Sequence, residues 1–156
     1  ALGWDWLANI SWFGTPSMAT VTIIVVSIWQ NIGFLMIIYT AGLQTIPKDV
    51  MESAELDGCS GLKKVLKIEL PLLMPTVTIN LFVSISGAFK SFDIPNAMTG
   101  GGPYGSTMPV AMNIYQEAFT KYNLGYGSAK SVILFLTVAA VTLIQLYCTR
   151  KKEVEY

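Results

Sequence analysis

Residues 52–71 read ESAELDGCSGLKKVLKIELP, and this stretch decides how the rest of the chain is interpreted. It mixes acidic and basic side chains, whereas a long apolar segment lies on either side of it. A polar stretch of this size between two apolar segments is expected at a membrane surface, where a soluble partner can reach it.

The composition of the whole chain also indicates a membrane protein. Of its 156 residues 53% are hydrophobic and 13% are charged, against about 25% charged in ordinary soluble domains. The net charge is zero, which gives no basic surface for nucleic acid. No histidine is present, and Cys59 and Cys148 are far apart, so imidazole catalysis and a metal site are not expected.

Three segments are long and apolar enough to be transmembrane helices. Residues 19–41 carry no charge and would span about 34 Å as a helix. Residues 72–92 follow Pro71, and residues 129–148 end just before the basic tail Arg150–Lys152. The sequence therefore predicts an all-α, polytopic membrane helix bundle with three transmembrane helices.

Polar side chains within these spans are candidates for a substrate pathway. They are Asn31, Asn80, Ser84 and Ser86. Polar groups cost free energy when they face lipid, so these should face other helices or a cavity. Hydrogen bonding between packed helices would explain them equally well, and both interpretations remain open.

Residues 46–70 predict a hairpin of two short helices. Asp49 lies in the first turn of the first helix, where an acidic group interacts favourably with the helix dipole. Gly58 suits the position after the helix end because it can adopt a positive φ, and Ser60 can cap the second helix. An amphipathic hairpin resting on the membrane surface, without a partner, is the simpler alternative.

Residues 93–127 predict an irregular segment followed by a short helix. Gly100, Gly101, Gly102 and Pro103 cannot form regular helix, and no Gly-Lys-Ser/Thr follows to complete a phosphate-binding loop. Side chains then recur at helical spacing, which predicts an amphipathic helix at the outer surface with this face packed in the core: Met108, Met112, Tyr115, Phe119 and Tyr122.

The basic residues predict the orientation. If residues 46–70 and the tail are cytoplasmic, the inside holds seven basic residues and the outside three, in accord with the positive-inside rule. The inner set is Lys48, Lys63, Lys64, Lys67, Arg150, Lys151 and Lys152, and the outer set is Lys90, Lys121 and Lys130. The first residues are then expected in an extracytoplasmic loop, with an odd number of spans preceding them if the parent begins in the cytoplasm.

Two motifs resemble those of one transporter family. The spacing Glu52-x-Ala54-x-x-Asp57-Gly58, with Ile68-x-Leu70-Pro71, resembles the cytoplasmic EAA loop of ABC importer permeases. One span later comes Met98-Thr99-Gly100-Gly101-Gly102-Pro103, and then Thr107, Tyr115, Phe119 and Gly125-Tyr126-Gly127-Ser128-Ala129. Together they are similar to the permease subunit of carbohydrate-type ABC importers, the group with the maltose and glycerol-phosphate systems.

The resemblance covers nearly all of residues 1–156 and implies the C-terminal half of a multi-pass permease in the bacterial cell membrane. It implies a transport subunit without catalytic activity or cofactor, because ATP is bound by a separate ABC ATPase dimer. A second, related permease subunit and an extracytoplasmic solute-binding protein are the other implied partners. The implied ATPase-coupling loop comprises Glu52, Ala54, Asp57, Gly58, Leu70 and Pro71, and Gly100–Pro103 would lie near the binding protein.

The sequence departs from the family pattern at a few positions and leaves alternatives. Ser53 and Cys59 replace alanines that are common in the loop, and Val65 stands where an aromatic residue is usual. A permease for amino acids or peptides carries a similar loop, and a membrane scaffold could use the loop merely to recruit a partner. A membrane-embedded enzyme would need a placed nucleophile or metal ligands, which the spans do not offer.

Overall fold

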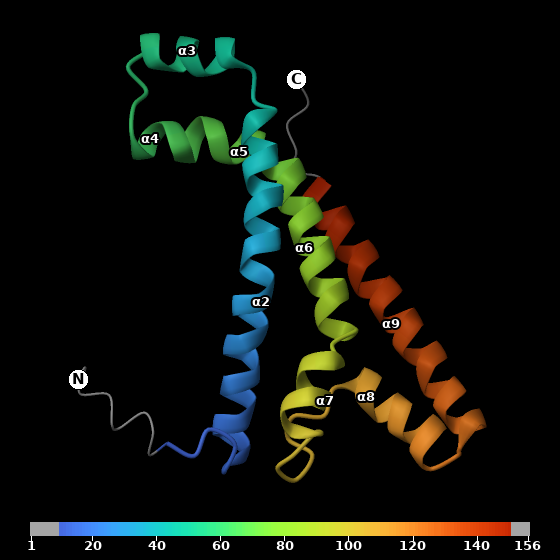
Figure 1. Ribbon diagram of the computed structural model, residues 1–156. Coiled ribbons are helices and arrows are strands. Elements are labelled where there is room, and N and C mark those ends of the chain that lie inside the picture. The colour runs from blue at the N-terminus through green and yellow to red at the C-terminus, as the bar shows by residue number, and fades with distance from the viewer. Residues whose placement is uncertain (1–9, 151–156) are drawn as a thin grey trace. The chain divides into compact units, whose positions relative to one another are not determined.

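The computed structural model describes residues 10–150, and every regular element in that range is helical (Figure 1). The predicted all-α class is therefore confirmed for this part of the chain. The described residues divide into two compact units. Unit 1 contains residues 10–31 and 89–135, and unit 2 contains residues 32–88 and 136–150. Lys151 and Lys152, which contribute to the predicted orientation, lie outside the described residues.

Two helices are each long and apolar enough to cross a membrane. They are α2 (Pro16–Gln44) and α9 (Leu124–Arg150). Both extend beyond the predicted spans, because helices continue past the edge of an apolar run until a cap or a breaker stops them. At the start of α2 the Thr15 hydroxyl accepts a hydrogen bond from the Met18 amide at 3.4 Å, and Pro16 occupies the first turn, where its missing N–H costs nothing.

The third predicted span is shorter than expected. It corresponds to α6 (Met74–Phe89), whose 16 residues would cover about 24 Å, less than a bilayer core. Residues 62–72 precede it as a helical run bent by 68° from α6. Pro75 accounts for the break, because its ring clashes with the carbonyl four residues earlier. The described residues thus contain two candidate spans, or three if the bent pair is one span.

The predicted hairpin forms two helical arms between α2 and α6 (Figure 1). The first arm is α3 (Lys48–Leu56), and the second contains α4 (Leu62–Lys64), the π-helix η1 (Val65–Glu69) and α5 (Leu70–Leu72). Gly58 has φ +73°, as predicted.

Two details of the second arm differ from the predictions. Ser60 does not cap it, because the residue before α4 is Gly61, whose carbonyl accepts bonds from the Lys64 and Val65 amides. Pro71 lies inside α5 instead of preceding the span. The wide π turn just before Pro71 moves the carbonyl with which a proline ring would otherwise collide.

The predicted irregular segment is confirmed for the glycines, and the short helix after it is confirmed only in part. After α7 (Asp93–Thr99) the chain is irregular from Gly100, and then α8 (Val110–Tyr115) continues into the π-helix η2 (Gln116–Thr120). This helix is shorter than predicted, with Met108 before it and Tyr122 after it.

The expected core face of this helix is wrong at its C-terminal end. Met112 is buried at 2% exposure, but Tyr115, Phe119 and Tyr122 are exposed. Glu117 and Ala118 are buried instead. In a π-helix the hydrogen bonds span five residues, so the buried side shifts away from the i, i+4, i+7 positions that a regular α-helix would predict.

Candidate functional site

The first arm of the hairpin presents its acidic residues to solvent. Glu52 and Asp57 are exposed, whereas Ala54 and Cys59 are buried. The Cys59 amide donates to the Ala54 carbonyl at 2.9 Å, so the chain folds back tightly across the end of α3. A small residue at position 54 allows this approach. Leu56, 89% exposed, is an apolar side chain next to the acidic ones.

The turn after α3 requires glycine at position 58. Its φ of +73° lies in the left-handed region, and its amide donates to the Glu55 carbonyl at 3.0 Å. No atom lies within 4 Å of the place where a Cβ would be. The restriction to glycine therefore comes from the backbone conformation, and the space beside Gly58 is open.

An ion pair that the sequence did not reveal joins the two arms. The Lys64 ammonium donates to a Glu55 carboxylate oxygen at 2.7 Å. This hydrogen bond and the lysine charge lower the pKa of Glu55. The nine-residue separation matches no helical spacing, so only the folded hairpin brings the two residues together. Leu70 is exposed and Pro71 half-buried on the second arm.

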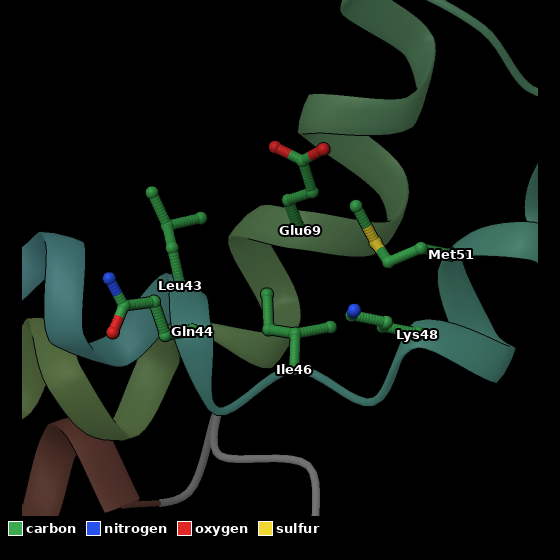
Figure 2. A pocket seen from close by; sticks show the side chains of 6 residues that line it. All are labelled: Leu43, Gln44, Ile46, Lys48, Met51 and Glu69. Atoms are coloured by element: carbon green, nitrogen blue, oxygen red, sulfur yellow. The ribbon is translucent and has the colours of Figure 1, made fainter.

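An open hollow lies where α2, α3 and η1 meet (Figure 2). Its volume is about 530 Å³. The lining residues include both charge signs and several apolar side chains: Leu43, Gln44, Ile46, Lys48, Met51 and Glu69.

The four pathway candidates have different environments. Asn80 is buried at 3% exposure, and its amide nitrogen donates to the Leu35 carbonyl of α2 at 3.5 Å. Asn31 is exposed and bonds within its own helix, to the Ser27 carbonyl at 2.8 Å. Ser84 is exposed and Ser86 is half-buried on α6. Asn80 thus joins two helices, whereas Asn31 and Ser84 remain open to solvent or to further protein.

Sequence reasoning missed a polar contact between α6 and α9. The Gln145 amide nitrogen donates to the Thr78 carbonyl at 3.3 Å, and Thr78 and Thr142 are buried. Gln145 could have been noticed as an amide inside an apolar run. Among the described residues the side-chain oxygens of Asn80 and Gln145 are buried without a hydrogen-bond partner.

The glycine-rich segment forms a closed turn. The hydroxyls of Thr99 and Thr107 lie 2.6 Å apart, and the Thr107 hydroxyl donates to the Gly102 carbonyl at 2.7 Å. Gly101, at φ +91°, is buried against Met108, whose methyl group would lie 3.0 Å from an added Cβ. Tyr104, 98% exposed, extends from this turn.

A buried carboxylate beside the start of α9 also escaped the sequence interpretation. Glu117, only 9% exposed, lies 2.9 Å from the Lys121 ammonium and 3.4 Å from that of Lys130. The Lys121 hydrogen bond is the main cause that lowers the pKa of Glu117. Lys130 also donates to the Asn113 side chain at 2.7 Å. These contacts fasten η2 to α9.

No group of three or more histidine, cysteine, aspartate or glutamate side chains within residues 10–150 could hold a metal ion.

Comparison with known proteins identifies the family. Residues 3–154 match the profile of the family described as binding-protein-dependent transport system inner membrane component. A permease protein of a probable starch degradation products transport system from Thermoanaerobacterium thermosulfurigenes is 37% identical over 96% of this chain and 51% of its own length. The sulfoquinovosyl glycerol transport system permease protein of Agrobacterium fabrum is 40% identical over 93% of this chain and 47% of its own.

The trehalose/maltose transport system permease protein of Thermococcus litoralis is 37% identical over 90% of this chain and 47% of its own length. The chain thus spans about half the length of these relatives, and the aligned part is their C-terminal half. The match identifies a membrane permease component, not an enzyme. The chain belongs to the family of binding-protein-dependent transport system inner membrane components.

Proposed function

We propose that this chain is part of the membrane-spanning permease subunit of an ATP-driven importer for sugars or sugar derivatives. The observation that carries the proposal is the α3 hairpin, which presents Glu52, Leu56 and Asp57 to solvent in a chain of this family. The substrate class is supported by the printed names of the relatives, which include starch degradation products, trehalose/maltose and sulfoquinovosyl glycerol.

The hairpin of residues 46–70 docks on the ATPase subunit from the cytoplasmic side. Leu56 fills an apolar part of a cleft on that subunit, and Glu52 and Asp57 pair with basic side chains at its rim. Exposed apolar and charged side chains in this combination are typical of the centre and rim of protein interfaces. Closure of the ATPase dimer then moves the hairpin and the helices attached to it, which produces alternating access.

The remaining parts of the chain take the other roles of a permease. The three spans are α2, α6 and α9. Asn31, Ser84 and Ser86 contribute to the substrate pathway, whereas Asn80 is buried and joins α6 to α2. Residues 93–127 are extracytoplasmic, and the turn Gly100–Pro103 presents Tyr104 to a solute-binding protein. A second, related permease subunit completes the pathway in the bacterial cell membrane.

Co-purification of the full-length parent with its ATPase subunit tests the docking assignment. The variant Gly58→Arg places a bulky side chain in the open space beside the α3 turn. The matched control is Gly105→Arg, since Gly105 has φ +74° and open space as well but lies in the extracytoplasmic segment. Both variants place a non-glycine residue at nearly the same positive φ, so a difference between them reports docking.

We expect Gly58→Arg to lose the ATPase and ATP-dependent uptake while remaining inserted in the membrane, and Gly105→Arg to keep the ATPase. Equal recovery of the ATPase from wild type and Gly58→Arg would contradict docking through this hairpin and favour a scaffold. Transport of amino acids or peptides, with no uptake of sugars, would correct the substrate class alone.

A further inference from the structure

We propose that Gly42, Thr76 and Asn80 are positioning residues that hold the start of α6 against the C-terminal part of α2. This inference rests on the proposed function, because it explains how displacement of the hairpin reaches the membrane spans. The contact between Gly42 and Thr76 and the hydrogen bond from Asn80 to Leu35 are together called the α2–α6 contact.

The chain connectivity makes this contact the point through which a docking force must pass. The hairpin has only two covalent attachments to the spans, the end of α2 at Gln44 and the start of α6 at Met74. If α2 and α6 could slide past each other, a displaced hairpin would pivot about these two ends without moving the spans. A fixed contact near the two ends would prevent such a pivot.

The first part of the contact is steric. Gly42 is buried, and a Cβ added there would lie 2.9 Å from the Thr76 Cβ, closer than real Cβ atoms approach. The absence of a side chain at Gly42 therefore lets the two helices meet directly. Thr76 is β-branched and has few χ1 alternatives in a helix, so it cannot turn aside easily.

The second part is a directional hydrogen bond further along the same two helices. Asn80 lies one turn beyond Thr76, and Leu35 lies about two turns before Gly42. Two separate points of contact fix both the rotation and the sliding of α6 against α2. A single point would leave one of these motions free.

The amide of Asn80 is better suited to fixing position than to adding stability. Its side-chain oxygen is buried and lacks a hydrogen-bond partner within the described residues, which costs free energy. An apolar side chain of similar size would fill this space without that cost. Buried polar groups of this kind can fix the register between helices, as a single buried asparagine does in coiled coils.

The third span is attached to α6 in its second half. The Gln145 amide of α9 donates to the Thr78 carbonyl of α6 at 3.3 Å. Residues 32–88 and 136–150 accordingly belong to one compact unit, which contains the whole hairpin together with parts of α2, α6 and α9.

A steric variant tests the Gly42–Thr76 part of the contact. Gly42→Ala adds a Cβ that would collide with the Thr76 side chain, so α2 and α6 must separate. Gly33→Ala is the matched control, because no atom lies within 4 Å of a Cβ added at that position of the same helix. In the full-length transporter complex we expect Gly42→Ala to lower the solute taken up per ATP hydrolysed, with ATPase binding unchanged, and Gly33→Ala to leave this ratio as in wild type. An unchanged ratio in Gly42→Ala would overturn the proposal.

A second variant tests the hydrogen bond from Asn80. Asn80→Leu should leave membrane insertion and ATPase binding unchanged. It should lower the amount of solute taken up per ATP hydrolysed by about threefold to tenfold, which corresponds to the free energy of one interhelical hydrogen bond. Asn80→Gln, which keeps the amide donor, should recover part of this ratio. Ile79→Leu, at an exposed position of the same helix, is the matched control and should not change it.

The outcomes separate the two proposals. An unchanged ratio in Asn80→Leu would overturn the role of the α2–α6 contact while ATP-dependent uptake by wild type still supports the importer. Absence of ATP-dependent uptake by the wild-type complex would overturn the proposed function itself.

Discussion

Replacement of Gly127 by alanine is expected to disturb the contact between η2 and α9, whereas the same replacement at Gly125 is not. A Cβ at position 127 would lie 2.8 Å from the Ala118 Cβ and 3.2 and 3.3 Å from the Ala118 Cα and N. Two of these three atoms are backbone, so no flexible side chain can move away. At Gly125 no atom lies within 4 Å of the added Cβ.

The magnitude follows from two opposing terms. Both glycines lie in the first turn of α9, where alanine gains helix propensity of up to about 1 kcal/mol over glycine. Overpacking at Gly127 costs about 1–3 kcal/mol, because backbone atoms must shift. The propensity term cancels when the two variants are compared, so Gly127→Ala should be less stable than Gly125→Ala by about 1–3 kcal/mol.

Thermal unfolding of the purified full-length parent in detergent measures this difference. At about 2–4 °C per kcal/mol, the Gly127→Ala variant should unfold about 2–12 °C below Gly125→Ala. Tryptophan fluorescence provides the signal, and the wild type provides the reference. Equal unfolding temperatures for the two variants would refute the close approach of η2 to α9, and so would a higher temperature for Gly127→Ala.

Two further predictions concern unit 1. The pKa of Glu117 in the folded protein is lowered from its usual 4.5. Its ion pairs therefore add stability above about pH 4.5, and this stability is lost as the pH falls toward the pKa in the folded protein. Unfolding temperatures measured between pH 3 and 6 should fall with pH in wild type and should fall less in Glu117→Gln. Thr107→Val removes the hydroxyl that donates to the Gly102 carbonyl, and it should lower the free energy of unfolding by about 1–3 kcal/mol. Thermal unfolding measures this loss, and proteolysis at Tyr104 should become faster. An unchanged cleavage rate would contradict a closed turn.

The parts of the fold that could be predicted from the sequence are those that depend on a local pattern of residues. The uncharged run at 19–41 identifies α2, and the signals for its true start, Thr15 and Pro16, are also readable in the sequence. The φ of Gly58 follows from its place after a short amphipathic helix. These features depend on neighbouring residues only, which is why they could be predicted without knowledge of the packing.

The features that were missed depend on which helices pack together. Glu117 is close to Lys130 only because η2 packs on α9, and Asn80 reaches Leu35 only because α6 packs on α2. No spacing in the sequence announces either pair. The failed cap at Ser60 has a different cause, since Gly61 at φ +57° supplies the turn that a serine cap would otherwise organise.

The π-helix η1 bears on how the second arm of the hairpin responds to the loss of a residue. Its hydrogen bonds span five residues, as in the bond from the Leu70 amide to the Val65 carbonyl. Loss of one residue within η1 would return this turn to regular α-helix, whereas loss of one residue from a regular part of the hairpin would turn everything beyond the deletion by about 100°. The hairpin cannot follow such a turn, because α3 is tied to α2 at the other end. Both ends of the hairpin are therefore fixed, and the number of residues between these ends is constrained as well as the type of residue at each position.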